Sequence, residues 1–237
     1  MKLYFNGCSH TYGDDLVDKN IAWPALIAQH HNCEFLNDSI SGGTNDRIVY
    51  RTIKHADQFD FFYIAWTYIP RFTRYRNDNN YEVNFNPGLA NDLYGKTSEF
   101  QQYGKLHYAV WYNELFAFKI WLQNIILLQR FFQSINKPYI MVNADHNNIN
   151  RWTGGCNEFN KSVHSLLCFD LMNDEQLIAE HKEIQQLITQ IDFTHYPGWN
   201  TWWITKLHTT YPVGPSKHLL EEGHQAVAQY IIGHANV

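Results

Sequence analysis

The chain has 237 residues, of which 45% are hydrophobic and 17% charged, the composition of an ordinary soluble globular protein. Its formal net charge is −5 and it has no run of lysines and arginines, so nothing in its charge favours nucleic acid or an anionic membrane as a partner. The four cysteines form no CxxC pair, and we therefore expect neither a metal site nor a disulfide framework.

The amino-terminal residues enter a strand pattern directly, without the apolar segment and cleavage site of a signal peptide. The most apolar helical stretch, from Ile120 to Phe132, is too short to span a bilayer and is interrupted by Gln and Arg. We expect a cytoplasmic protein without membrane contact, which lysis of the producing cell could release.

Apolar runs and amphipathic stretches alternate along the chain. Strands are predicted at Lys2–Asn6, Glu34–Asn37, Phe59–Trp66 and Pro138–Asn143, and helices at Trp23–His31, from Thr44 or Asn45 to His55, and at Tyr108–Gln133, Glu175–Ile191 and Glu221–His234. This alternation predicts a single α/β domain over residues 1–237, with three layers and a parallel sheet of about five strands.

Two stretches, at about 73–105 and 145–174, lack periodicity and follow the third and fourth predicted strands. We interpret them as insertions. Loops that follow parallel strands reach the carboxyl edge of the sheet, where ligands bind in open α/β folds. Both insertions are therefore expected to cover that edge and to shape a site there.

A serine follows the first predicted strand directly, in the sequence Gly7-Cys8-Ser9. A serine at a turn from strand to helix can present its hydroxyl at the carboxyl edge of the sheet, and its own backbone N–H can point at an oxyanion. The alternative is a polar turn in which the serine only caps a helix, because such turns are common.

Two histidines flank the start of the last predicted helix. His218 lies in the preceding loop and could reach across the sheet edge to a serine that follows the first strand. The alternative for His218 is an exposed loop residue. His224 lies six residues later on the helix, and we interpret it as a packing residue.

A third motif follows the second predicted strand and runs from Asn37 to Asn45, with a Gly42-Gly43 pair. Glycines allow close backbone approach to a ligand, and their N–H groups can donate to an oxyanion. The alternative is a plain glycine turn.

In their order along the chain, these three motifs resemble the blocks of the SGNH, or GDSL-type, hydrolases. Gly7-Cys8-Ser9 matches the first block, the Asn-led segment ending at Gly42 matches the second, and His218 with a Gly-His pair at 223–224 matches the last. The chain also looks like divergent members of this family found in phage genomes. The resemblance implies a flavodoxin-like sheet and an esterase with Ser9 as nucleophile and His218 as general base, needing no cofactor or metal.

The sequence departs from the family pattern at two functional positions. The oxyanion-donating Asn of the family is absent after the third strand, so Thr67 or Asn45 would have to assist the backbone N–H groups of Ser9 and Gly42. The position three residues before the histidine, where the family carries its acid, is Pro215. A backbone carbonyl or a remote carboxylate such as Asp192 could orient the histidine instead, or the site could be a Ser-His dyad.

The sequence leaves several questions open. The chain could be a non-catalytic descendant of the fold, used for binding or as a structural part, or a thiol enzyme that uses Cys8 with His10 or another base. The expected substrate is a small-molecule or carbohydrate ester, such as an O-acetylated sugar, by analogy with the family. Tryptophans in loops, at positions 152, 199, 202 and 203, could line a cleft for it or could be packing residues. The sequence gives no prediction of the oligomeric state.

Overall fold

A parallel sheet forms the centre of the computed structural model, which describes residues 1–75, 82–85, 98–147 and 174–235. Its strands are β1 (Lys2–Asn6), β2 (Glu34–Asn37), β3 (Phe61–Trp66) and β6 (Tyr139–Asn143), in the order β2-β1-β3-β6. All neighbouring pairs in this sheet are parallel. The four predicted strands are thus confirmed to within two residues, although the described sheet has four strands rather than about five.

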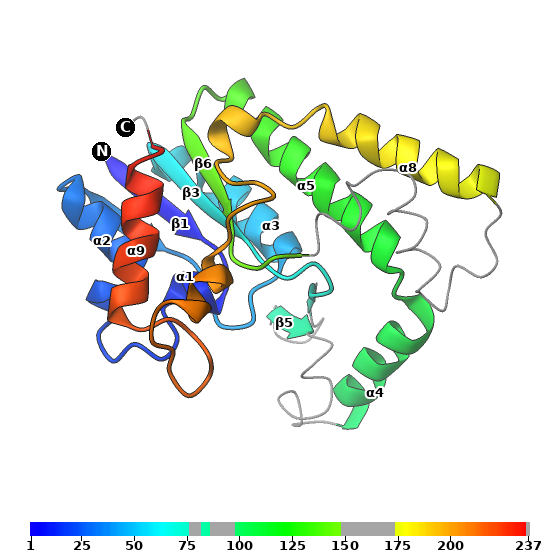
Figure 1. The fold of residues 1–237 in the computed structure, drawn as a ribbon, viewed down its shortest axis with the longest axis horizontal. Helices are drawn as coiled ribbons and strands as arrows, with labels where there is room; N and C mark the ends of the chain where they lie inside the picture. The colour runs from blue at the N-terminus through cyan, green and yellow to red at the C-terminus, as the bar shows by residue number, and fades with distance from the viewer. Residues whose placement is uncertain (76–81, 86–97, 148–173, 236–237) are drawn as a thin grey trace.

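Helices cover both faces of the sheet (Figure 1). On one face, α2 (Trp23–His30) packs beside α9 (Glu221–Ile232). On the other face lie α3 (Asn45–His55) and α5 (Glu114–Ser134), and α8 (Asp174–Ile188) packs against α5. The molecule therefore has the predicted three layers.

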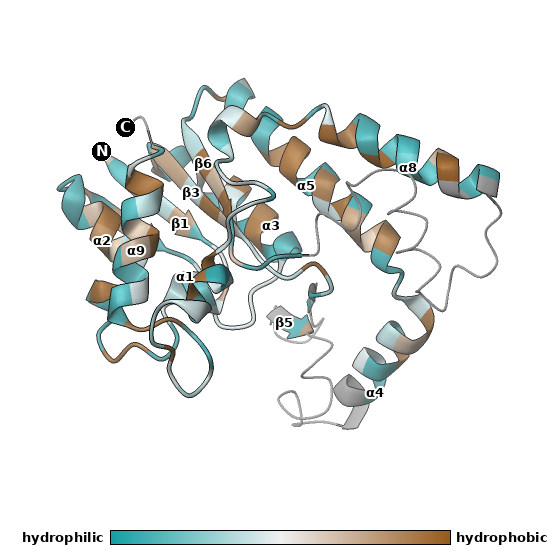
Figure 2. Ribbon diagram, viewed as in Figure 1, coloured by the Kyte–Doolittle hydropathy of each residue, from teal (hydrophilic) through white to brown (hydrophobic). Residues whose placement is uncertain are grey.

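Successive strand residues alternate between the two layers. Leu3 and Phe5 of β1 belong to the apolar cluster that contains α2 and α9, whereas Tyr4 belongs to the cluster that contains α3 and α5. This alternation is the period of two expected of a strand, here with both faces buried as in parallel sheets. Figure 2 shows the resulting hydrophobic colouring of the strands and of the helix faces turned toward them.

The long helix predicted at Tyr108–Gln133 is divided in the structure. A nine-residue helix, α4 (Ser98–Leu106), continues into a π-helix at His107–Trp111, and α5 begins only at Glu114. The side chain of Asn113 accepts a hydrogen bond of 2.9 Å from the backbone N–H of Phe116, which caps the new helix. By length and composition α5 resembles a membrane-spanning helix, but half of its most apolar window is buried against the protein.

Part of the insertion at 73–105 is a hairpin rather than irregular chain. Strands β4 (Phe72–Tyr75) and β5 (Glu82–Phe85) pair antiparallel, and the Thr73 hydroxyl bonds that of Thr44 just before α3. This contact places β4 beside the segment that follows β2, as expected for an insertion at the carboxyl edge. Residues 148–173, which make up most of the second insertion, lie outside the described part of the chain.

The free edge of β6 is covered by an irregular segment that includes residues 196–205. Asn143 donates from Nδ2 to the carbonyl of Trp199 at 2.6 Å, and the N–H of Thr205 donates to the carbonyl of Ala144 at 3.0 Å. The Tyr196 hydroxyl donates to Oδ1 of Asn143. Pro197 and Gly198 break any strand pattern here, so this segment covers the edge without adding a fifth strand.

Candidate active site

Ser9 lies where the chain leaves β1 and enters the short helix α1 (Ser9–Tyr12). Cys8 is the residue before the helix, and its carbonyl accepts from the N–H groups of Thr11 and Tyr12 at 2.9 Å. Ser9 is 4% exposed, and within the described chain its own N–H makes no backbone hydrogen bond. A free N–H at the first turn of a helix is a ready donor for an oxyanion.

The Gly42-Gly43 turn lies directly against the segment that carries Ser9. Gly42 has a φ of +70°, in the left-handed region that favours glycine. A Cβ added at Gly43 would lie 2.6 Å from the carbonyl oxygen of Gly7 and 3.4 Å from Cα of Cys8. The close approach of two backbones therefore requires glycine here, and it brings the first and second motifs together.

The end of β3 is held by side chains from neighbouring segments. Asn45 accepts from the N–H of Thr67 at 2.9 Å and donates to its carbonyl at 3.2 Å. Arg71 donates from Nη1 to the Thr67 hydroxyl at 2.9 Å and, at 3.5 Å, to the carbonyl of Gly43. The amide of Asn45 thus fixes the backbone of Thr67, and the hydroxyl of Thr67 keeps its own hydrogen to donate.

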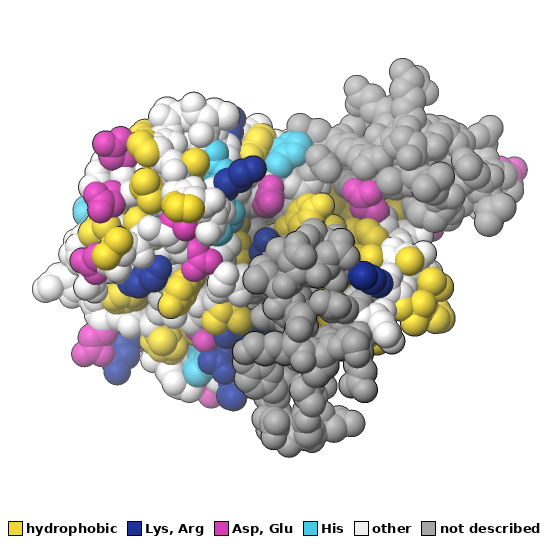
Figure 3. All heavy atoms as spheres, turned by 90° about the horizontal axis from the view of Figure 1, so that it is seen from below, with side chains coloured by type: hydrophobic (Ala, Val, Ile, Leu, Met, Phe, Trp, Pro, Cys, Tyr) yellow, Lys and Arg dark blue, Asp and Glu magenta, His cyan; other side chains and the backbone are white. Residues whose placement is uncertain are grey.

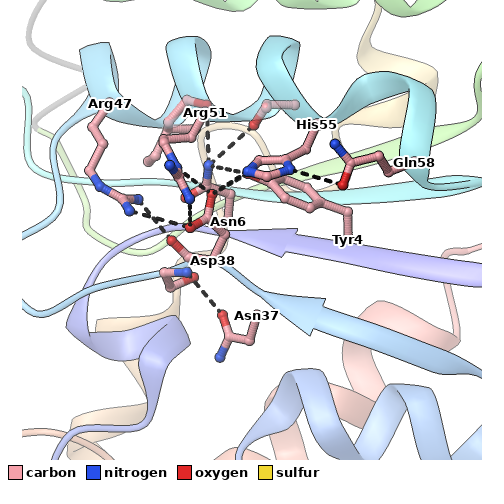
Figure 4. A network of polar contacts seen from close by, with 11 residues as sticks. Tyr4, Asn6, Asn37, Asp38, Arg47, Arg51, His55 and Gln58 are labelled. Atoms are coloured by element: carbon pink, nitrogen blue, oxygen red, sulfur yellow. Dashed lines mark hydrogen bonds and ion pairs between the residues drawn. The ribbon is translucent and has the colours of Figure 1, made fainter.

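The network around Asp38 anchors the loop that leads to Gly42 (Figure 4). Asp38 accepts from Arg51 at 2.8 Å through both carboxylate oxygens, from the Tyr4 hydroxyl at 2.8 Å and from Arg47 at 3.3 Å. Burial raises the pKa of Asp38, but these hydrogen bonds and the two guanidinium charges lower it more, so the pKa lies below its ordinary value. The loop that carries the glycine turn therefore rests on a buried ionic network.

His218 lies at the same edge of the sheet as Ser9. Its ring centroid is 4.7 Å from that of His10, the residue that follows Ser9 in α1. His218 lies in a tight loop. In this loop the N–H of Gly214 donates to the carbonyl of His218 at 2.8 Å, and Val213 forms a β-bridge with Leu219. Among the described residues the Ser9 hydroxyl makes no hydrogen bond to His218, a common situation in ligand-free sites, whose hydrogen bonds often tighten only when substrate binds.

A third imidazole lies beside this contact, that of His208, for which the sequence indicated no role, whereas it offered His10 only as a possible base for Cys8. The ring of His208 lies 5.4 Å from that of His10. Burial, together with the neighbouring His218, His208 and Arg71, holds the pKa of His10 well below its ordinary value. Burial also lowers the pKa of His208, with a contribution from His218. His10 and His208 therefore stay neutral at physiological pH.

A carboxylate lies beside His218, but it is not the one the sequence suggested. Oδ2 of Asp15 is 3.5 Å from Nδ1 of His218. Asp192 instead bonds Nδ1 of His195 at 2.8 Å, and His195 packs on Tyr139 at the amino end of β6. The suggestion of Asp192 is therefore wrong, because its carboxylate lies at the opposite end of the sheet from Ser9.

The predicted packing roles of Cys8 and His224 are confirmed, and Trp199, for which the sequence left two roles open, is a packing residue as well. Cys8 is 1% exposed and belongs to the apolar cluster beneath α2 and α9, turned away from the sheet edge. His224 is buried, and its Nδ1 accepts from the N–H of Trp23. Trp199 stacks on Trp121 in the core, with ring centroids 5.5 Å apart.

The other tryptophans that the sequence singled out differ in their surroundings. Trp202 stacks on Tyr230 of α9 at 3.9 Å, so it is also a packing residue. Trp203 packs on the ring of His146 at 4.4 Å, with Lys206 over its face. Trp152 lies outside the described residues. The structure therefore assigns Trp199 and Trp202 to packing, and among the described members of this group Trp203 remains as a candidate wall of a cleft.

A pocket shares residues with the candidate site. It is lined by Asn45 and Arg71, together with apolar residues that include Ile69, Phe72 and Trp111. Figure 3 views the molecule from below, where histidine, acidic, basic and hydrophobic side chains are interspersed over the described part of the surface. No group of three or more His, Cys, Asp or Glu side chains within the described ranges is arranged to hold a metal ion.

Comparison with known proteins gives a likeness of fold only. The sequence matches no family model and no curated protein. Similar solved structures include a lipolytic protein of the G-D-S-L family from Desulfitobacterium hafniense, at 14% identity over 99% of each chain with a TM-score of 0.47. A psychrotrophic esterase from Pseudoalteromonas matches at 10% identity over 98% and 95% of the two chains (TM-score 0.48). A catalytic mutant of an acetylxylan esterase from Geobacillus stearothermophilus matches at 15% over 98% and 93% (TM-score 0.48). Such distant matches carry no argument about activity, so the function of this chain depends on its own residues.

Proposed function

We propose that this protein is a serine hydrolase of the SGNH type that cleaves an ester, with Ser9 as nucleophile and His218 as general base. The observation that supports this most directly is the convergence of three distant segments at one edge of the sheet. Ser9 begins α1, the Gly42-Gly43 turn packs on the backbone of Gly7, and His218 lies against the ring of His10.

In this mechanism, Nε2 of His218 takes the hydroxyl proton of Ser9 while Oγ bonds to the ester carbonyl carbon. The N–H groups of Ser9 and Gly42 and the Thr67 hydroxyl donate to the resulting oxyanion. Asn45 serves by holding the backbone of Thr67. His218 then returns the proton to the leaving alcohol as the ester C–O bond breaks. A water molecule, deprotonated by His218 in the same way, attacks the acyl group on Ser9 and releases the acid.

The resemblance of the motif blocks supports a small-molecule or carbohydrate ester as the substrate class. The pocket beside Arg71 is consistent with such a ligand, because aromatic and aliphatic side chains form most of its wall around a few polar groups. The proposal includes no metal and no cofactor, since acyl transfer through serine needs neither.

The test compares hydrolysis of p-nitrophenyl acetate by the wild type, Ser9→Ala and His218→Ala. Both substitutions are expected to abolish turnover without changing the melting temperature, and the exposed His30→Ala serves as the matched control. The rate should also fall on acidification, because a protonated imidazole cannot accept the serine proton. A wild type no faster than either variant would reject the proposal.

A second candidate is a non-catalytic binding protein with the same fold. Two departures from the family pattern favour it: Pro215 stands where the family carries its acid, and the oxyanion-donating Asn is absent after the third strand. A fluorophosphonate probe distinguishes the two candidates, since it labels only an activated serine. Cys8 is no longer a strong alternative as nucleophile, because it is buried in the core; the Cys8→Ala variant is expected to retain activity, and iodoacetamide to leave it intact.

A further inference from the structure

The chain bends sharply after α1, and the bend aims Asp15 at the loop that carries His218. Gly13 has a φ of +85° and Asp15 itself a φ of +68°. A non-glycine residue in the left-handed region is uncommon, and such strain persists only where the surrounding contacts hold it.

Within the described part of the chain, the hydrogen bonds and the ion pair of the Asp15 carboxylate go to one loop. Oδ2 accepts the backbone N–H of Ser216 at 2.9 Å and that of His218 at 3.2 Å, and it lies 3.5 Å from Nδ1 of His218. The side chains of Asp15 and His218 are only 10% and 13% exposed. Gly214 completes the fit, since a Cβ there would lie 2.4 Å from Cβ of Asp15.

The carboxylate is ionised where it meets the imidazole. Burial raises the pKa of Asp15, but the two backbone hydrogen bonds and the neighbouring His218 lower it more, so that it lies below its ordinary value. The other titratable groups around His218 are His10, His208 and His224, and burial favours the neutral form of each. Of these groups, only Asp15 supplies a negative charge.

We propose that Asp15 is the positioning residue of His218, an acid supplied from the segment after α1 instead of from the loop before the histidine. This inference rests on the proposed function. The 3.5 Å between them is an ion-pair distance without a formed hydrogen bond, and a small turn of the imidazole would let Asp15 hold the hydrogen of the ring on Nδ1, which leaves Nε2 free to take the Ser9 proton. Asp15 stays ionised throughout, stabilises the imidazolium that forms, and accepts no proton itself. Pro215, at the position where the family carries its acid, has no group that could do this.

The test variant is Asp15→Asn, and the matched control is its neighbour Asp14→Asn. An amide oxygen can still accept both backbone N–H groups, and Asn tolerates the left-handed region, so the substitution removes the charge and keeps the loop. We expect kcat for p-nitrophenyl acetate to fall by about 10²–10⁴-fold with KM nearly unchanged. The acid limb of the pH–rate profile should move to lower pH, because the imidazolium loses its neighbouring charge.

A second variant covers the case in which Asp15→Asn does not fold. Asp15→Gly removes the carboxylate but relaxes the backbone, because glycine adopts this φ without strain. It is expected to show the same loss of kcat. Turnover of either folded variant within about threefold of Asp14→Asn, with an unmoved pH profile, would overturn the proposal.

A readout that needs no catalysis separates this inference from the proposed function. The ring signals of His218, assigned by their absence in His218→Ala, are followed by NMR as a function of pH. They should titrate at lower pH in Asp15→Asn than in Asp14→Asn. A wild type without esterase activity or probe labelling would remove the proposed function alone, whereas identical titration in the two variants would remove the role of Asp15.

Discussion

The backbone N–H of Trp23 donates a hydrogen bond of 3.1 Å to Nδ1 of His224, and this bond joins the start of α2 to the start of α9. Burial lowers the pKa of His224 to about 4, with smaller contributions from His218 and Lys19. Because an unfolded histidine titrates near 6.5, the unfolded chain binds more protons than the folded chain between pH of about 6.5 and 4. The stability that this residue contributes is present above that window and is lost as the pH falls through it.

We therefore expect the His224→Asn variant to be less sensitive to acid than the wild type. Asparagine can still accept from the N–H of Trp23 but does not titrate. The drop in the free energy of unfolding between about pH 7 and pH 4.5 should shrink by about 2–3 kcal/mol, measured by urea titration at each pH. His30→Asn, at an exposed position, should leave the drop unchanged. Equal drops in wild type and His224→Asn would contradict this assignment.

Loss of the Asp38 carboxylate should destabilise the whole domain. Arg47 is only 5% exposed, so removal of its partner leaves a guanidinium charge inside the protein. We expect Asp38→Ala to lower the free energy of unfolding by about 3–5 kcal/mol, as measured by denaturant titration. The control is Asp57→Ala at the surface, which should change stability by less than about 0.5 kcal/mol. A small effect at Asp38 would mean that the network contributes little net stability.

The contact between the Gly42-Gly43 turn and the backbone of Gly7 predicts that one added methyl group lowers the activity. In Gly43→Ala the new Cβ would meet the carbonyl oxygen of Gly7 at 2.6 Å, which must push the turn away from Ser9. Esterase activity should fall by at least about 10-fold, the order of effect expected when catalytic groups move by about 1 Å. Gly233→Ala is the matched control, because its Cβ would make ordinary contacts of 3.4 Å and 3.6 Å. Equal activity in the two variants would exclude a role for this contact.

The hydroxyl of Thr67 is testable as an oxyanion donor. Thr67→Val keeps the shape of the side chain but removes the hydroxyl, and kcat should fall by about 10²–10³-fold with KM little changed. Thr67→Ser should restore most of the rate, since serine retains both the donor and the acceptor for Arg71. If valine and serine variants are equally active, the oxyanion is held by backbone N–H groups alone.

The strands were predictable from the sequence because each is a short apolar run with a clear end. Phe59–Trp66 shows this well, since its continuous apolarity predicted a strand buried on both faces and β3 is buried throughout. The boundary of α5 was not predictable in this way. The stretch from Tyr108 to Asn113 continues the apolar pattern of α5, so the sequence pattern shows no break. In the structure the π-helix at His107–Trp111 ends first, and the cap at Asn113 marks the start of α5.

The candidate site was predictable only in part, for a physical reason. Ser9 and His218 each stand next to a turn that ends or begins a regular element, which leaves a local signal in the sequence. Asp15 leaves none, because its role depends on two residues with positive φ and on a loop 203 positions away. His208, and the contact of His10 with His218, were missed for the same reason, since ring contacts between distant segments have no sequence pattern.

The order in which the parts of the site occur along the chain has a consequence for its synthesis. The proposed nucleophile and Asp15 emerge from the ribosome before the loop of His218 and α9. A nascent chain therefore carries an unassisted serine until α9 docks on α2, and the hydrogen bond from Trp23 to His224 marks that docking. The proposed hydrolytic activity would therefore report on completed tertiary closure, since every fragment that ends before residue 218 lacks the proposed base.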